Sequence, residues 1–356
     1  MRRAALVAAA AAATATGLTG CAALRDGAGY YWQSVSGHLA VMHAARPVEQ
    51  WLADPATDAT LRARLELAQR IRRFASESLG LPDNASYTRY ARLERAFVVW
   101  NVFATPELSL ELRRWCFPVV GCVDYRGYYA REAAERYAGS MRAQGLEAYV
   151  GGVPAYSTLG WFADPLLSTF IGYPEAELAR LVFHELAHQV AYAPGDTAFN
   201  ESFATAVEQV GIERWIQARG DARLADAYAA YAARRRDFLA LLDRHREALR
   251  ALYASDADLA AKRAGKQAAL QALRDEYAAI RRDRWGGFAG YDRWFAQPLT
   301  NAHLASVSTY TEFVPAFRAL LASQGGDLAR FYGAAHELAA ATPERRRARI
   351  EALSGS

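Results

Sequence analysis

The spacing of hydrophobic and polar positions predicts that most of this chain is helical. Over residues 45–79, apolar side chains recur every three or four positions with arginines between them, which is typical of a helix with one buried face. A longer stretch of the same kind covers residues 214–284 and is interrupted at residues 255–258. We therefore expect two long helices there that form a hairpin, with their many charged positions facing solvent.

Between these helical stretches the pattern changes to that of short strands. Residues 97–104 are rich in β-branched and aromatic side chains, and residues 146–150 form a second such run, so both predict strands. Residues 127–145 lie between them and predict a helix. The sequence therefore predicts an α+β fold that is mostly helical and contains a small β-sheet.

The first twenty residues have the composition of a secretory signal. Two arginines precede an apolar run over residues 4–15, which is shorter than the roughly 20 residues of a membrane-spanning helix. Residues 18–21 read Leu-Thr-Gly-Cys and resemble the lipobox of bacterial lipoproteins, which implies cleavage before Cys21 and lipid attachment to it. By the same analogy, Ala22 favours the outer membrane. The alternative is an ordinary signal followed by a chance cysteine.

Length and charge narrow the classes of function. Beyond a signal over residues 1–20, residues 21–356 are long enough for one large domain or two closely packed ones, and we expect a single domain. The net charge of +4 includes two arginines of the signal, so the rest of the chain is nearly neutral. Nucleic-acid-binding proteins usually carry a concentrated basic patch, so we expect no nucleic-acid partner.

Cys116 and Cys122 are the two cysteines that remain. The segment between them contains a proline and a glycine, which suit a tight loop, and a secreted chain folds in an oxidising compartment. We expect a disulfide between them, and two free thiols are the alternative. A cysteine metal site is not expected, because no further cysteine is available.

The strongest chemical signal is the pentapeptide His-Glu-Leu-Ala-His at residues 184–188. Two histidines four residues apart project from one face of a helix, so His184 and His188 can offer their imidazole nitrogens to one zinc ion. Glu185 can take a proton from a water molecule that this ion activates. A helix start at Pro174 supports this reading. The alternative is a helix that happens to bury two histidines.

A third ligand is expected on the following helix. Glu201 comes thirteen residues after His188, and a short turn would bring its helix back against the first, so Glu201 can reach the metal. Residues 200–204 read Asn-Glu-Ser-Phe-Ala and resemble the second motif of the glutamate zincins. Glu208 is the competing carboxylate, or else it orients a ligand histidine. A salt-bridged or exposed Glu208 is the alternative.

Taken together, the two motifs resemble those of the gluzincin metallopeptidases. Several stretches are more narrowly similar to a family of bacterial lipoproteins that are predicted aminopeptidases. These stretches are residues 30–38, 116–128 and 157–161, together with both zinc motifs. The resemblance spans nearly all of the chain beyond the signal, and it implies one zinc ion and a peptide substrate.

We expect one metallopeptidase domain with three parts. They are a zincin-like core over about residues 87–215, the helical hairpin over about residues 220–284, and a C-terminal helical part over residues 285–356.

Two further features of a peptidase site have candidates in the sequence. In HExxH peptidases the strand before the zinc helix often forms an open edge, to which a peptide adds as one more strand. Our candidates for this edge are Ser157, Thr158, Leu159, Gly160 and Trp161. Tyr310 and His303 are the candidates for stabilising the oxyanion, although each could instead be a packed core residue. Glu208 and Glu312 are conceivable ligands for a substrate α-amine.

These observations predict a lipid-anchored zinc peptidase that faces the periplasm at the bacterial cell envelope, with aminopeptidase activity as the first choice. An endopeptidase or an amidase of envelope peptides could use the same site. A non-catalytic binding or scaffolding lipoprotein that retains a zincin fold is the rival from another class, and the intact motifs argue against it. The pair His336-Glu337 imitates the motif without its second histidine, so such pairs alone are not diagnostic.

Overall fold

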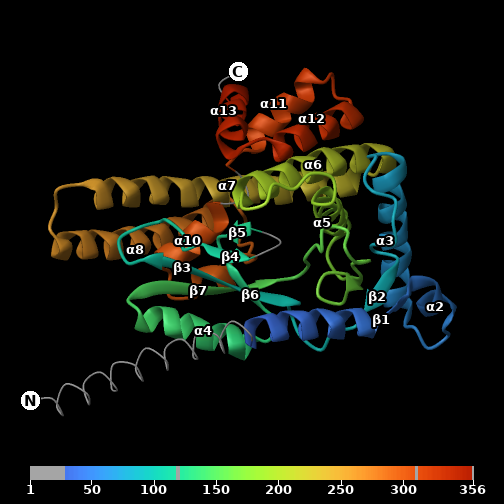
Figure 1. Cartoon of the computed structure of the whole chain (residues 1–356), viewed down its shortest axis with the longest axis horizontal. Helices are drawn as coiled ribbons and strands as arrows, with labels where there is room; N and C mark the ends of the chain where they lie inside the picture. The colour runs from blue at the N-terminus through green and yellow to red at the C-terminus, as the bar shows by residue number, and fades with distance from the viewer. Residues whose placement is uncertain (1–28, 118–120, 309–311, 355–356) are drawn as a thin grey trace, which may run out of the picture.

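Helices make up most of the chain, and small β-sheets lie among them (Figure 1). The computed structural model describes residues 29–117, 121–308 and 312–354. The predicted α+β class is therefore correct in its coarse form. Within these described ranges, no helix combines the length and the apolar character that a transmembrane span requires.

The N-terminal part is more broken than its apolar pattern suggested. Residues 29–44 are helical, and a short strand β1 (Ala45–Pro47) follows where the pattern had predicted helix. Helix α2 (Val48–Ala53) ends at a turn, and α3 (Ala59–Glu77) then begins after Asp58, whose carboxylate accepts a hydrogen bond from the backbone N–H of Leu61. Pairing of β1 with a neighbouring strand outweighs the helical periodicity here.

The main sheet has the strand order β6-β3-β7 and is antiparallel. Both predicted strands belong to it, as β3 (Val99–Pro106) and β7 (Leu146–Val153). The predicted helix between them begins later than expected, as α4 (Arg131–Ala143), because β6 (Arg126–Tyr128) pairs with β3 instead. The buried side of α4 packs on this sheet through Ala134, Ala138 and Met141.

Two smaller sheets complete the β-structure of the described residues. One joins β1, β2 (Arg89–Ala91) and β8 (Leu166–Leu167). The other is a hairpin of β4 (Trp115–Phe117) and β5 (Gly121–Val123), in which Cys116 and Cys122 lie opposite each other and form the predicted disulfide.

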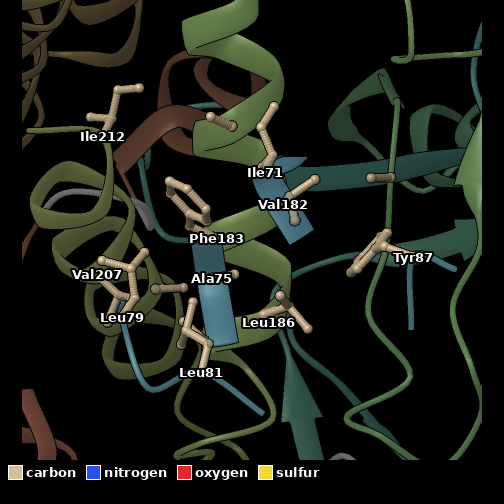
Figure 2. Packing of buried hydrophobic residues seen from close by; sticks show 14 of the residues in the cluster. Ile71, Ala75, Leu79, Leu81, Tyr87, Val182, Phe183, Leu186, Val207 and Ile212 are labelled. Carbon is tan, nitrogen blue, oxygen red and sulfur yellow. The ribbon is translucent and has the colours of Figure 1, made fainter. Parts of the chain in front are cut away.

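The core of the molecule lies where α3 meets α5 (Glu175–Ala187) and α6 (Thr197–Arg219). In Figure 2, Phe183 of α5 points into this core, toward Leu79 after α3 and toward α6, and Leu186 of α5 is buried in the same cluster. Gly211 of α6 permits this close packing, because a Cβ atom there would come within 2.6 Å of the Phe183 ring. One side of α5 is thus fixed by apolar contacts, which leaves its other side for chemistry.

The remaining helices form two groups. The predicted hairpin is present as α7 (Ala222–Ala254) and α8 (Leu259–Asp283), and α9 (Asp292–Phe295) and α10 (Asn301–Ser308) share its hydrophobic cluster. Helices α11 (Val314–Ser323), α12 (Leu328–Ala340) and α13 (Pro343–Ser354) instead join the main core, where Phe317 of α11 contacts the rings of Phe199 and Phe203 of α6. The C-terminal helices therefore support α6.

Candidate functional site

Helix α5 presents His184 and Glu185 in its last turn, and His188 caps its C-terminal end. The apolar residues of the helix determine which side faces the core, since Leu178, Val182 and Leu186 are all buried in the main cluster. The histidines lie four residues apart on the remaining side and point away from that packing.

The turn between α5 and α6 is held by side chains of the second motif. The amide group of Asn200 accepts a hydrogen bond from the backbone N–H of Ala193 at 2.7 Å and donates one to its carbonyl at 2.9 Å. Asp196 caps the start of α6 by accepting a hydrogen bond from the N–H of Phe199. These contacts fix the first turn of α6, and Glu201 in that turn faces the two histidines.

The three side chains converge on one point. Nε2 of His184 lies 3.2 Å from Nε2 of His188 and 3.3 Å from Oε2 of Glu201, and the last two atoms are 3.9 Å apart. Ligands of one tetrahedral zinc ion, with bonds of about 2.0–2.1 Å, are separated by roughly 3.3 Å. Among the described residues, this is the one group of His, Cys, Asp or Glu side chains arranged to hold a metal. The donor set therefore fits a single zinc ion.

Glu208 lies behind His184 rather than beside the other two ligands. Its Oε2 is 3.1 Å from Nδ1 of His184, and its Oε1 accepts a hydrogen bond of 2.7 Å from Arg180. Burial alone would raise the pKa of Glu208, but the positive charge of Arg180 and the hydrogen bond with His184 lower it to about 2. An ionised Glu208 orients the imidazole so that Nε2 faces Glu201, which is the role of an outer-sphere carboxylate.

The protonation of the two histidines differs because their partners differ. Burial disfavours the charged form of His184, yet hydrogen bonds with Glu201 and Glu208 outweigh it and raise the pKa to about 10. Burial lowers the pKa of His188 to about 4. Without a cation, a proton on His184 therefore compensates the charge of the carboxylates. A metal would have to displace this proton, so metal binding weakens as the pH falls.

Glu185 lies next to the three converging side chains and lines a cleft with them. Burial raises the pKa of Glu185 to about 8, while the charge of His184 opposes this shift and that of Glu201 adds to it. A divalent cation at the three ligands would favour the carboxylate form. Glu185 then has the position and the charge state that a general base requires.

The cleft above these residues has a volume of about 460 Å³, and six tyrosines are among its lining residues. Sequence reasoning missed most of this lining, since it comes from segments that are far apart along the chain. The tyrosines among its residues are Tyr30, Tyr31, Tyr125, Tyr129, Tyr156 and Tyr192. The sequence did carry one signal, because most of these tyrosines lie in or next to the stretches that resemble the aminopeptidase family.

The disulfide hairpin forms one wall of the cleft through Phe117 and Val123. It also packs on the turn before α6, because the position of a Cβ atom on Gly121 would lie 2.6 Å from the backbone nitrogen of Gly195. Gly121 has a φ of +75°, which also favours glycine. The disulfide hairpin thus supports both the wall of the cleft and the turn before α6, the helix that carries Glu201.

The predicted substrate edge at Ser157, Thr158, Leu159, Gly160 and Trp161 is wrong as a strand. These residues form a loop and a turn, in which Leu159 and Gly160 have φ values of +56° and +82°. Asp164 fixes the turn by accepting hydrogen bonds from the backbone N–H and the hydroxyl of Thr158. Ser157 and Leu159 still line the cleft, whereas Trp161 projects into solvent. Strands of the main sheet border the cleft instead, β3 through Val99 and Asn101 and β7 through Val153.

Of the two predicted oxyanion donors, only His303 belongs to the described residues, and it does not line the cleft. His303 of α10 is buried, and the centroid of its ring lies 3.9 Å from that of Tyr149 on β7, so the prediction for His303 is wrong. Burial lowers the pKa of His303 to about 3. Tyr310 falls outside the described residues. Glu312 is exposed and does not line the cleft, and Glu208 is engaged by Arg180.

Comparison with known proteins identifies the family of the chain. A family model described as "Putative aminopeptidase" matches residues 29–350, and the chain therefore belongs to that family. Neither the search of curated proteins nor the search of solved structures gave a significant match. Membership in the family suggests peptidase activity.

Proposed function

We propose that this chain, as a member of that family, is a zinc-dependent peptidase of the gluzincin type with a zincin-like core. The observation that carries the proposal is the convergence of His184, His188 and Glu201 within 3.2–3.9 Å, with Glu185 beside them on the floor of a cleft. The three ligands would hold one zinc ion. When bound, zinc would polarise the scissile carbonyl and acidify a water molecule.

Glu185 supplies the proton transfers of the reaction. Its carboxylate accepts a proton from the attacking water and then donates it to the nitrogen of the leaving amine as the peptide bond breaks. Burial favours the protonated form of Glu185, whereas a bound cation would favour the carboxylate, so the two effects oppose each other and the group can both take up and release a proton. One residue can therefore serve as base and as acid in the same turnover.

Tyr125 and Tyr192 are suited to stabilise the carbonyl oxygen as it gains negative charge. Both line the same cleft as Glu201, and burial, with a smaller contribution from the charge of Glu201, raises the pKa of each hydroxyl. A phenol that keeps its proton is a hydrogen-bond donor of the kind that oxyanion stabilisation needs. These two residues replace His303 in our proposal.

We further propose that the enzyme acts at the bacterial cell envelope. The lipobox-like sequence at residues 18–21 supports lipid attachment at Cys21, and the alanine that follows favours the outer membrane. The catalytic domain would then face the periplasm and act on peptides there.

Aminopeptidase activity is the first choice, in line with the description of the family. Endopeptidase activity is the second candidate, and a specific observation favours it. Among the described residues that line the cleft, the only carboxylates are Glu185 and Glu201, and both are engaged in the chemistry proposed above. An aminopeptidase needs a further group that binds the α-amine of its substrate.

Digestion of a broad peptide library, followed by mass analysis of the fragments, tests this proposal. We expect zinc-replete protein to cleave peptides, the chelated protein to be inactive, and added zinc to restore the activity. Removal of single N-terminal residues would identify an aminopeptidase, and internal fragments an endopeptidase. A protein that contains no zinc and cleaves no peptide would contradict the proposal and favour a binding role.

A further inference from the structure

Large hydrophobic side chains are exposed on one face of the N-terminal helix and on the turn next to it. Of the eight such side chains in the described residues, six belong to this surface, which we term the aromatic face. Trp32 and Trp161 are 74% and 76% exposed. The complete set is Tyr31, Trp32, Val35, Leu39, Trp161 and Phe162.

The aromatic face is continuous, and the helix that carries it is firmly packed. Trp32, Val35 and Leu39 follow the spacing of one helical face. The ring of His38 on the same helix lies 4.6 Å from the ring of Phe162, which joins the helix to the turn.

The opposite side of this helix makes specific contacts with the body of the protein. Gln33 donates a hydrogen bond to the carbonyl of Gly127 and accepts one from the N–H of Tyr129, so it pairs with the edge of β6 as a strand would. Gly37 lies so close to Tyr129 that a Cβ atom would come within 2.2 Å of its ring. The inner side of the helix is therefore held against the body of the protein, and the aromatic face is the side that remains exposed.

The aromatic face also lacks formal charge. No Asp, Glu, Lys or Arg occurs between Asp26 and Arg46, or between Glu147 and Asp164. A contiguous exposed hydrophobic surface without charge marks a site of interaction with another molecule or with a membrane. Tryptophan and tyrosine side chains favour the interface between water and lipid.

We propose that the aromatic face docks into the interface of the membrane that holds the protein. This inference rests on the lipid anchor proposed above, and it is independent of the proposed catalysis. Seven residues separate Cys21 from residue 29, where the described helix begins, and they can span at most about 25 Å. The helix therefore cannot lie far from the bilayer. A lipid anchor binds stably when a second signal reinforces it, and the aromatic face supplies that signal.

Docking in this orientation would bring the rim of the cleft to the membrane surface. Tyr31 belongs to the aromatic face and also lines the cleft, and Tyr30 beside it lines the cleft as well. Peptides held at the membrane surface would then reach the catalytic residues directly.

Quenching of tryptophan fluorescence by brominated lipids tests the proposal. The full chain is reconstituted into vesicles of phosphatidylethanolamine and phosphatidylglycerol, with or without bromine on the acyl chains. We expect bromine to quench part of the fluorescence, because Trp32 and Trp161 enter the interface. The double variant Val35→Glu/Leu39→Glu retains both reporters but places charge on the aromatic face, so we expect the quenching to be lost.

A matched control separates this effect from a general change in charge. The variant Leu259→Glu/Phe288→Glu alters the two exposed hydrophobic side chains outside the aromatic face, and it should be quenched like the unaltered protein. Equal fluorescence in brominated and plain vesicles would overturn the proposal. So would quenching that Val35→Glu/Leu39→Glu does not change. A dimer in light scattering that this variant dissociates, without quenching in the unaltered protein, would overturn it in favour of a contact between two copies of the chain. None of these readouts depends on peptide hydrolysis.

Discussion

The tetrapeptide His-Glu-Leu-Ala occurs twice in this protein, at residues 184–187 in α5 and at residues 336–339 in α12. In both helices the leucine and the alanine pack toward the main core. The preceding histidine and glutamate therefore point away from the core in both cases. What they meet there is entirely different.

In α12 the pair His336-Glu337 faces solvent, and Nδ1 of the histidine has only a long contact of 3.4 Å with a backbone carbonyl. In α5 the same pair lies in a cleft, with His188 one turn further on and Glu201 approaching from α6. A histidine-glutamate pair thus gains its chemistry from the second histidine and from the helix opposite, and the four shared residues do not supply it.

The largest effect is expected when the second histidine is removed. His188→Ala leaves two protein ligands, so we expect loss of stoichiometric zinc and of peptide hydrolysis, whereas His336→Ala should change neither. Elemental analysis of the purified variants, together with a peptide assay, measures this. If His188→Ala retained all of its zinc, the second histidine would not be what distinguishes α5 from α12.

The carboxylate behind the first histidine should have the next largest effect. Glu208→Gln keeps the shape of the side chain but no longer provides a charged partner for Nδ1 of His184, so zinc should bind about 10- to 100-fold more weakly. Glu337→Gln is the matched control in α12. Competition with a chelator of known affinity measures the change, with circular dichroism as a check on folding. Equal affinities for both variants would show that Glu208 does not orient the ligand.

The disulfide hairpin supports the α5–α6 turn, and α12 has no such support. Cys116→Ser/Cys122→Ser should lower the free energy of unfolding by about 2 kcal/mol, because the unfolded chain is no longer constrained across this short loop. Denaturant unfolding of the variant and the oxidised protein, each loaded with zinc, measures the difference. An unchanged unfolding free energy would mean that the link contributes little to holding this wall in place.

The smallest expected effect is on the pH dependence of stability, and it compares the buried His303 with the exposed His336. Its pKa is about 3 in the folded protein and 6.5 when unperturbed, so the unfolded chain gains a proton below about pH 6.5 that the folded chain does not. The folded protein therefore loses stability as the pH falls, by about 1 kcal/mol between roughly pH 6.5 and pH 5.5. We expect His303→Gln to lose this part of the pH dependence.

The control for this experiment is His336→Gln, since that side chain is exposed. Urea unfolding at several pH values compares the two variants with the unaltered protein. If the free energy of unfolding changed with pH in the same way in His303→Gln and in His336→Gln, His303 would not be the source of this pH dependence.

Features set by neighbouring residues could be predicted from the sequence. The spacing of His184 and His188 and the cysteine pair each depend on a few consecutive residues, and the structure has both arranged as expected. The role of Glu201 could be predicted as well, because one short turn separates its helix from α5. Strands β3 and β7 could be predicted from their local composition, and the hairpin helices from the periodicity of their apolar residues.

Features set by distant contacts could not be predicted. The segment around Leu159 was expected to be a strand because it precedes the zinc helix, but it is a loop with two positive φ angles that Asp164 holds in place. His303 has the chemistry of an oxyanion donor, but it packs against Tyr149 far along the chain. The aromatic lining of the cleft combines Tyr30 with segments more than ninety residues away, and no local pattern specifies that meeting.

The central claim is that Glu185 transfers protons beside a zinc ion held by α5 and α6. The most direct test is the hydrolysis rate of zinc-loaded Glu185→Gln protein. We predict that it retains one zinc ion per chain and loses activity by a factor of about 10² to 10⁴. A metal-replete Glu185→Gln protein that cleaves peptides at the rate of the unaltered protein would contradict the account.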